Sequence, residues 1–290
     1  MLEHMTIEDL TDSDFELFRK VIYEKSGISL NDSKKELLRT RLRSRLERDG
    51  YPSYRSFLNE VKADTSGKTI IILLDAISTN LTSFYRESGH FDFLRSVLPG
   101  WIAAKRKAND LSFRIWSAGC SSGEEPYTLA FIMLEMLGEG IDHWDIKILG
   151  TDLSTDILRR AMDGKYDVEK LKELPTLVRD RYFVRETGDV VTKSGKILRN
   201  RPLVRIVPEV REMVTFRRLN LMESFPFKRQ FDFIFCRNVM IYFDKQTQGV
   251  LVNKFANFLR EGGYLFIGHS ESLTGLKHNF KYIQPTVYQK

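Results

Sequence analysis

The chain has 290 residues, 42% of them hydrophobic and 29% charged, and its formal net charge is +6 at pH 7. This length can bury one large core or two smaller ones, and the composition excludes disordered, fibrous and disulfide-rich classes. Because no apolar run approaches the length of a membrane span and no cysteine or histidine spacing matches a structural metal site, we expect a cytoplasmic protein without a metal ion or direct membrane insertion.

Helical periodicity dominates the first part of the chain. Apolar residues recur every three or four positions in segments that cover residues 12–26, 33–49, 53–63 and 69–77. Gly27 and Gly50 follow the first two segments, where a glycine is suited to the left-handed conformation that ends a helix. The sequence therefore predicts a helical N-terminal domain over residues 1–78.

Charge is unevenly distributed within this domain. Residues 1–24 hold two basic and seven acidic residues, whereas residues 34–48 hold seven basic and two acidic residues. In the second segment Arg41, Arg45 and Arg48 share one helical edge, and arginine is suited to holding carboxylates. We expect these three arginines to bind an acidic protein partner, although a basic stripe is more often only a solvated face.

Residues 79–110 form the junction to the rest of the chain. The stretch from Ser78 to Arg86 mixes hydroxyl and amide groups with aromatic side chains. Its propensities predict the start of a helix capped by Thr82 or Ser83, and residues 90–107 continue as helix.

A strand, a small-residue loop and a helix follow at residues 113–134. The loop covers residues 118–123, and Glu124 and Glu125 open the helix. In dinucleotide-binding folds a pyrophosphate sits at such a helix N-terminus, but two carboxylates there would repel it. A cationic ligand without phosphates is favoured, and S-adenosylmethionine, which carries sulfonium and ammonium groups, has this chemistry. Alternatively, Glu124 belongs to a capping box that begins at Ser121.

The second half of the chain has the alternating pattern of an α/β fold. Strands are predicted at residues 146–152, 214–219, 231–236 and 264–268, and helices at 155–162 and 246–259. Polar residues stand at the strand ends, namely Asp152, Asn220, Arg237, Asn238 and His269. Since ligands bind at the carboxyl ends of strands in open α/β sheets, these residues are expected to converge on one site. Asp152 is suited to ribose hydroxyls and also to capping the helix that follows it.

The hydrophobic period changes between residues 182 and 207. Short β runs alternate there with turn-forming stretches at residues 187–189 and 193–196. This pattern predicts a small, basic, antiparallel β insertion within the α/β domain.

Several stretches together match a known pattern, namely residues 79–86, 117–127, 151–152, 220–221, 235–243 and 268–271. They resemble the chemotaxis receptor methyltransferases, the CheR family of S-adenosylmethionine-dependent protein-glutamate O-methyltransferases. The resemblance spans nearly the whole chain. It implies an α/β fold: a Rossmann-like class I methyltransferase domain over residues 111–290, a small antiparallel β-subdomain inserted at about 180–210, and a helical N-terminal receptor-recognition domain.

The resemblance also implies which residues bind the cofactor, namely Asn80, Thr82, Arg86, Glu124, Asp152, Asn220, Leu221, Arg237 and Asn238. The first three would close over S-adenosylmethionine from the domain junction. Glu124 would meet its amino-acid portion or nearby polar groups, and Asp152 would meet its ribose. Asn220 and Leu221 would border the adenine, and the last two would line the methionine end.

The implied chemistry needs few catalytic groups. A glutamate side chain has a pKa of about 4.3 and is already ionised at pH 7, so its methylation requires no general base, metal ion or covalent nucleophile. We expect Arg86 and Arg237 to orient the incoming carboxylate and Tyr242 to line its approach. The expected partner is the cytoplasmic domain of a chemotaxis receptor, with no nucleic acid, and the expected state is a monomer.

Two other functions stay open from the sequence alone. An RNA methyltransferase is favoured by the isoelectric point of about 9.1. It is disfavoured because residues 236–239 read Cys-Arg-Asn-Val where base N-methyltransferases usually carry an Asn/Asp-Pro-Pro-aromatic motif. The other function is a non-catalytic regulator that keeps the fold as a module for binding S-adenosylmethionine.

Overall fold

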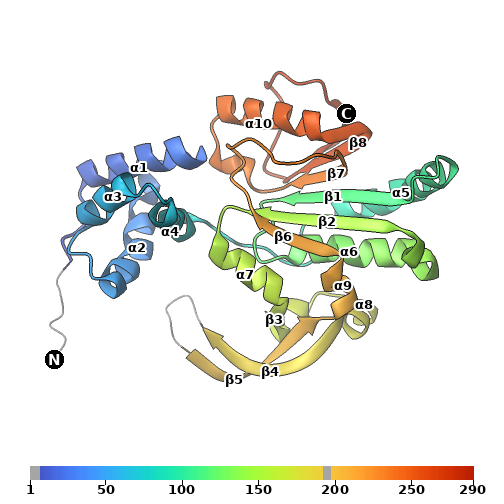
Figure 1. Ribbon diagram of the computed structural model, residues 1–290, viewed down its shortest axis with the longest axis horizontal. Helices are drawn as coiled ribbons and strands as arrows, with labels where there is room; N and C mark the ends of the chain where they lie inside the picture. Colours follow the sequence, from blue (N-terminus) through green and yellow to red (C-terminus); the bar gives the residue numbers. More distant parts are fainter. Residues whose placement is uncertain (1–6, 192–196) are drawn as a thin grey trace.

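The computed structural model describes residues 7–191 and 197–290, and its first part is helical (Figure 1). The four predicted helices are confirmed as α1 (Asp12–Ser26), α2 (Lys35–Asp49), α3 (Tyr54–Ala63) and α4 (Lys68–Ile77). Gly27 and Gly50 adopt the left-handed conformation at the ends of α1 and α2, as predicted. Leu38, Leu42 and Leu46 are completely buried, so one apolar stripe of α2 packs into the core of this part.

A seven-stranded sheet forms the second part, in the order β6-β2-β1-β7-β8-β10-β9. Its strands are β1 (Ser112–Ala118), β2 (Asp145–Asp152), β6 (Val214–Arg218), β7 (Phe231–Cys236), β8 (Leu259–Ile267), β9 (Lys281–Gln284) and β10 (Val287–Gln289). The first five strands of that order pair in parallel, whereas β10 pairs antiparallel with β8 and β9. Taken in chain order, the parallel strands follow the doubly wound arrangement 3-2-1-4-5. The predicted α/β class is confirmed, and the C-terminal hairpin is an element that the sequence patterns missed.

Helices cover both faces of this sheet (Figure 1). They are α5 (Gly89–Lys107), α6 (Glu124–Leu137), α7 (Thr155–Asp163) and α10 (Lys245–Phe258), with short helices α8 (Thr176–Tyr182) and α9 (Pro208–Glu212) beside them. Neighbouring residues of β1 pack into different hydrophobic cores, because successive side chains of a strand point to opposite faces of the sheet. Ile115 packs with α5 and α6, and Trp116 packs with α10.

The predicted β insertion is present as a three-stranded antiparallel sheet, β3-β5-β4. It comprises β3 (Lys165–Asp167), β4 (Phe183–Val191) and β5 (Ile197–Ile206), and β4 and β5 form a long curved hairpin (Figure 1). The turn expected at residues 187–189 is wrong, since β4 continues through it with a register shift between Gly188 and Val190. An irregularity of this kind accommodates a glycine without ending the strand. The second expected turn, at residues 193–196, lies outside the described residues.

The junction differs from its prediction. The helix starts at Gly89 and not after Thr82 or Ser83, and residues 78–83 run over the second domain without regular structure. Tyr85 and Glu87 have φ angles of 52° and 55°, which interrupt a right-handed helix. Residues held in this sparsely populated region often lie at functional sites.

The helical part contacts the carboxyl-end loops of the large sheet. Thr155, at the start of α7, donates to the Asp75 carboxylate from its backbone N–H and its hydroxyl, at 3.0 Å in both cases. The Asn220 amide donates to the Lys25 carbonyl at 2.6 Å, and the Ser29 N–H donates to the Tyr242 carbonyl at 2.8 Å. Within the described ranges, no helix has the length and apolarity needed to cross a membrane.

Candidate active site

A cavity lies where the helical part meets the carboxyl ends of β1, β2, β6 and β7, and its empty volume, mouth included, is about 1270 Å³. Residues 77–83 and the N-terminal end of α2 form one wall, and the strand ends form the other. Most residues that the sequence assigned to a site lie around it, namely Asn80, Thr82, Arg86, Asp152, Asn220, Leu221, Arg237, Asn238 and Tyr242. Of the predicted strand-end residues, His269 lies outside the lining.

The glycine loop approaches the cavity with its backbone. Gly119 has a φ of 83°, and a Cβ atom there would lie 2.3 Å from Cγ2 of Val239, another lining residue. The N–H groups of Gly119 and Cys120 both donate to the Thr151 carbonyl at 2.8 Å, which ties the loop to the end of β2. Only glycine can occupy this position without displacing the opposite wall.

Asp152 is the buried acidic group at the end of β2. Its carboxylate accepts hydrogen bonds from the Ser121 N–H at 2.8 Å and from the Ser154 N–H at 3.0 Å. Burial raises the pKa of the Asp152 carboxyl, and these backbone N–H groups oppose the rise. The alternative role as helix cap is wrong, because the Ser154 hydroxyl caps α7 by accepting from the Ile157 N–H.

The two glutamates at the start of α6 have different surroundings. Glu124 is completely buried, forms an ion pair with Lys170, accepts from the Ser122 hydroxyl at 2.6 Å, and does not line the cavity. Glu125 does line it. Successive helix residues point about 100° apart, so only one of the pair can face the ligand. The capping-box alternative is also wrong, since the Ser121 N–H donates to Asp152 and not to Glu124.

Arg237 is held between two carboxylates. Its Nη1 donates to Glu125 at 2.8 Å and its Nη2 donates to Glu87 at 3.0 Å and to the Arg86 carbonyl. Its guanidinium also lies over the Phe91 ring, 5.3 Å from the centroid, and the residue is only 6% exposed. Although burial raises the pKa of Glu87, Arg237 and Asn238 hold it below its ordinary value. Arg237 is therefore anchored before any substrate arrives.

Arg86 contrasts with Arg237. Its Nη1 donates to the Leu81 carbonyl at 2.7 Å, which braces the loop over the cavity. No ion pair joins it to a carboxylate in the part of the chain that the structure describes. The charge of this half-buried side chain is thus available to an anionic group in the cavity.

The three arginines predicted to share one surface of α2 separate into two kinds. Arg41 donates to the carbonyls of Ala76, Ile77 and Ser78 at 3.4, 3.1 and 2.7 Å, so it caps the C-terminus of α4. Burial lowers the pKa of its guanidinium. Arg41 is therefore a structural contact and the expectation that it meets a partner is corrected. Arg45 and Arg48 both pair with Asp49, and no other ion pair joins either of them to a carboxylate within the described ranges.

Sequence reasoning missed several groups that complete the cavity. Ser29, Leu30, Lys34 and Leu37 line it from the helical part, although nothing local to them suggests a ligand. For Glu125 a signal existed, since both carboxylates of the pair were recognised, but the sequence alone does not show which one faces inward.

The cavity suits a ligand that combines an apolar ring with charged groups. Leu153, Leu219 and Leu221 provide apolar surface near Asn220, the buried Asp152 suits hydroxyl groups, and Glu125 suits a cation. The absence of a side chain at Gly119 lets the backbone of the glycine loop approach the ligand closely. These features fit S-adenosylmethionine.

The chain is similar to known proteins over nearly its whole length. The family model "CheR methyltransferase, all-alpha domain" matches residues 13–78, and "CheR methyltransferase, SAM binding domain" matches residues 80–289. A Borreliella burgdorferi protein named "Chemotaxis protein methyltransferase" is 40% identical over 97% of this chain and 95% of its own length. The Pseudomonas aeruginosa "Chemotaxis protein methyltransferase 2" is 36% identical over 96% of this chain and 93% of its own length. An Escherichia coli protein with the first of these names is 35% identical over 96% and 91%.

Proposed function

This chain belongs to the CheR methyltransferase family, a group of S-adenosylmethionine-dependent methyltransferases, and we propose that it methylates glutamate side chains in the cytoplasmic domains of chemotaxis receptors. The products are glutamate methyl esters and S-adenosylhomocysteine. The observation that supports a glutamate substrate most strongly is that the carboxylates lining the cavity already accept hydrogen bonds from the protein.

Both carboxylates that line the cavity already accept hydrogen bonds. Asp152 accepts from backbone N–H groups, and Glu125 accepts from the Ser117 hydroxyl at 2.6 Å and from Arg237. Burial raises the pKa of the Cys120 thiol well above its ordinary value, so this lining residue is no thiolate nucleophile at neutral pH. A site with these groups favours an acceptor that arrives deprotonated, as a glutamate does at pH 7.

The residues of the chain contribute mainly by positioning. S-adenosylmethionine supplies an electrophilic methyl group on a sulfonium when it is bound. Arg86 orients the incoming carboxylate, and Arg237 fixes Glu125 and Glu87 in place and keeps the methionine end of the site rigid. Tyr242 lines the approach. Holding two reactants in near-attack geometry can replace general acid–base catalysis as the main source of rate.

The cofactor contact at Asp152 gives a direct prediction. Replacing Asp152 with asparagine should weaken binding of S-adenosylhomocysteine by about 1–3 kcal/mol, because the amide leaves hydrogen-bond donors facing each other in a buried site. Isothermal titration calorimetry measures this change. Asp75→Asn is the matched control, since Asp75 holds the start of α7 without lining the cavity. An equal loss of affinity in both variants would assign the effect to a displaced loop between β2 and α7 and not to the loss of a ribose contact.

Receptor docking is proposed for the outer edge of α2. Arg45 and Arg48 lie on the helical edge that leads from Lys34 and Leu37, which line the cavity. Receptor glutamates lie among other acidic residues, so a basic surface beside the cavity mouth matches them. Because Asp49 is the only partner of both arginines among the described residues, little energy opposes an exchange of partners.

The Arg45→Glu/Arg48→Glu variant should therefore methylate receptor about three- to thirtyfold more slowly at low substrate, as expected when exposed ion pairs become repulsive. Its affinity for S-adenosylhomocysteine should not change. Raising the salt concentration should slow the wild type more than the variant, because salt screens exposed charges. Arg43→Glu, on the opposite edge and paired with Glu47, is the control. Wild-type receptor methylation in the double variant would remove α2 from the docking surface.

The chemical identity of the product tests the proposed function itself. Receptor fragments incubated with methyl-labelled cofactor should carry label that mild alkali releases as methanol, which is the behaviour of a carboxyl methyl ester. Alkali-stable label in protein would indicate N- or C-methylation and contradict the proposal. Label in RNA would identify an RNA methyltransferase, and tight cofactor binding without transfer to either substrate would identify a non-catalytic regulator.

A further inference from the structure

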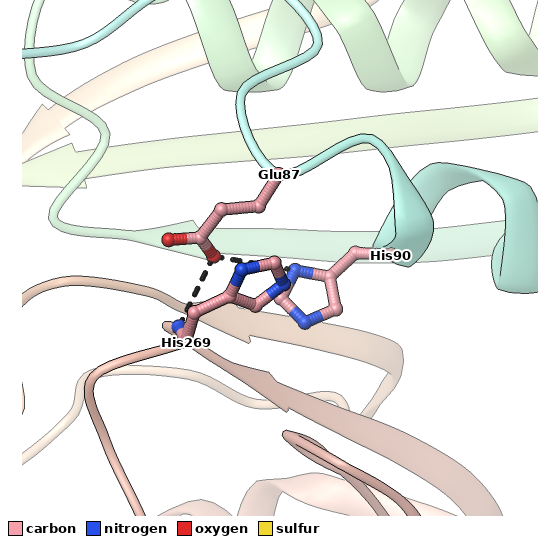
Figure 2. Close-up of side chains that lie close together, drawn as sticks. All are labelled: Glu87, His90 and His269. Atoms are coloured by element: carbon pink, nitrogen blue, oxygen red, sulfur yellow. Dashed lines mark hydrogen bonds and ion pairs between the residues drawn. The ribbon is translucent and has the colours of Figure 1, made fainter.

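Glu87, His90 and His269 come together beside Arg237, which pairs with Glu87 and lines the cavity. One potential ligand atom of each lies within 4.8 Å of those of the other two. Glu87 precedes α5, His90 lies in its first turn, and His269 follows β8. Figure 2 shows the Glu87 carboxylate pointing toward the two imidazole rings, whose centroids are 5.1 Å apart. None of the three lines the cavity.

The hydrogen bonds of His90 are compatible with a tautomer that leaves its Nδ1 atom free to ligate a metal ion. The Thr286 hydroxyl lies 2.6 Å from the Pro285 carbonyl, to which it can donate. The Nε2 atom of His90 lies 2.5 Å from the same hydroxyl oxygen, and it donates to this oxygen in the tautomer that keeps the hydroxyl bond to Pro285. Since a neutral imidazole carries one N–H, the Nδ1 atom of that tautomer holds a lone pair.

That lone pair faces another acceptor. The Nδ1 atom lies 3.6 Å from Oε2 of Glu87. It is buried and has no hydrogen-bond partner in residues 7–191 and 197–290. Two acceptors directed at one another in a buried place are unfavourable unless a positive species is shared between them. The pair therefore points to a cation, which is either a proton or a metal ion.

The positions of the two histidines suit a metal ion that enters from solvent. A neutral imidazole is the form that ligates metals. His269 is exposed, which provides a path from solvent, whereas His90 is only 2% exposed.

Glu87 can bind an ion through the oxygen nearest His90, which is Oε2, if the ion takes the place of one of the donors to that oxygen. Its Oε1 accepts from Asn238 at 3.1 Å, and its Oε2 accepts from Arg237 at 3.0 Å and from the His269 N–H at 3.3 Å. A carboxylate offers about four lone-pair sites. The charge of Arg237 is also balanced by Glu125, which reduces its repulsion of a second cation nearby.

We propose that Glu87, His90 and His269 form a binding site for a divalent transition-metal ion, for which Zn²⁺ is the probe. Two imidazoles and one carboxylate are ligands that Zn²⁺ and its neighbours prefer, with water completing the coordination. This proposal departs from the expectation from the sequence that the protein binds no metal ion. Because Glu87 is shared with Arg237, an ion in this site competes with Arg237 for the same carboxylate oxygen.

Calorimetric titration of the metal-free full-length protein with Zn²⁺ tests the site. One equivalent is expected to bind, and His269→Ala should weaken that binding by at least about ten- to a hundredfold, because loss of a mere hydrogen-bond partner of a ligand already costs that much. His269 is the residue to replace, because removing the buried His90 could unfold the protein. His143→Ala, which removes an exposed histidine that lies outside the cluster, is the matched control and should bind Zn²⁺ as the wild type does.

Three results would overturn the proposal. They are the absence of stoichiometric binding, unchanged affinity in His269→Ala, and an equal loss in His143→Ala. Nitrogen-15 NMR of the metal-free protein is an independent test. A protonated Nδ1 of His90 at pH 7 would show that a proton occupies the position between the two acceptors. All these measurements read metal or proton binding and do not depend on which substrate is methylated.

Discussion

Arg86→Gln is expected to lower kcat for receptor methylation by about 10²–10³-fold, the size of loss that follows removal of one preorganised charged or polar group from a reacting centre. Arg86 has this importance because it is the lining arginine whose charge no described carboxylate neutralises. Arg237, in contrast, is paired with both Glu87 and Glu125. Steady-state kinetics with a receptor fragment measure the effect.

The accompanying binding measurement separates two roles of Arg86. If the guanidinium mainly orients the glutamate substrate, the affinity for S-adenosylhomocysteine should fall much less than kcat. An equally large loss of cofactor affinity would assign Arg86 to the methionine carboxylate instead. Arg106→Gln replaces an exposed arginine near the far end of α5 and is the matched control. Wild-type turnover in Arg86→Gln would exclude any catalytic contribution from this residue.

Arg237→Ala is expected to destabilise the fold by about 3–5 kcal/mol, because it leaves two carboxylates in a buried place without their shared cation. Glu87 and Glu125 are 12% and 13% exposed at their side chains, so water compensates little. Urea denaturation, followed by circular dichroism, measures the free energy of unfolding. The variant should also lose the hydrogen bond that holds the Arg86 carbonyl, and with it most of its activity.

A second substitution tests the electrostatic origin of this loss. Arg237→Ala/Glu87→Gln should recover part of the stability, since it removes one of the two unpaired charges. The pH dependence has a defined sign as well. Arg237 holds the pKa of Glu87 below its ordinary value, so in the wild type this pair stabilises the protein above the unfolded-state pKa and the stabilisation is lost as pH falls through the folded-state pKa. An unchanged urea midpoint in Arg237→Ala would contradict the proposed anchoring.

Secondary structure and fold class were predictable where the determining signal is local. The stripe of Leu38, Leu42 and Leu46 is a pattern within one helix, and the apolar run at residues 231–236 is typical of a strand buried on both faces. The helix start at the junction was predicted wrongly for a physical reason. Hydroxyl residues favour helix caps, but here tertiary contacts at Ser78 and Asn80 hold residues 78–83 without regular structure, and positive φ angles at Tyr85 and Glu87 delay the helix until Gly89.

The sequence by itself determined the helical and α/β halves, the glycine loop and the polar strand ends, because periodicity, glycine placement and the order of strands act over short distances. Only the tertiary structure decided which carboxylate faces the cavity and which arginine is available. Glu125, not Glu124, lines the cavity, and Arg41 caps α4. The cluster of Glu87, His90 and His269 likewise joins residues more than 170 positions apart. Such outcomes depend on the rotation of each helix against its neighbours and on the packing of distant segments, which no local pattern specifies.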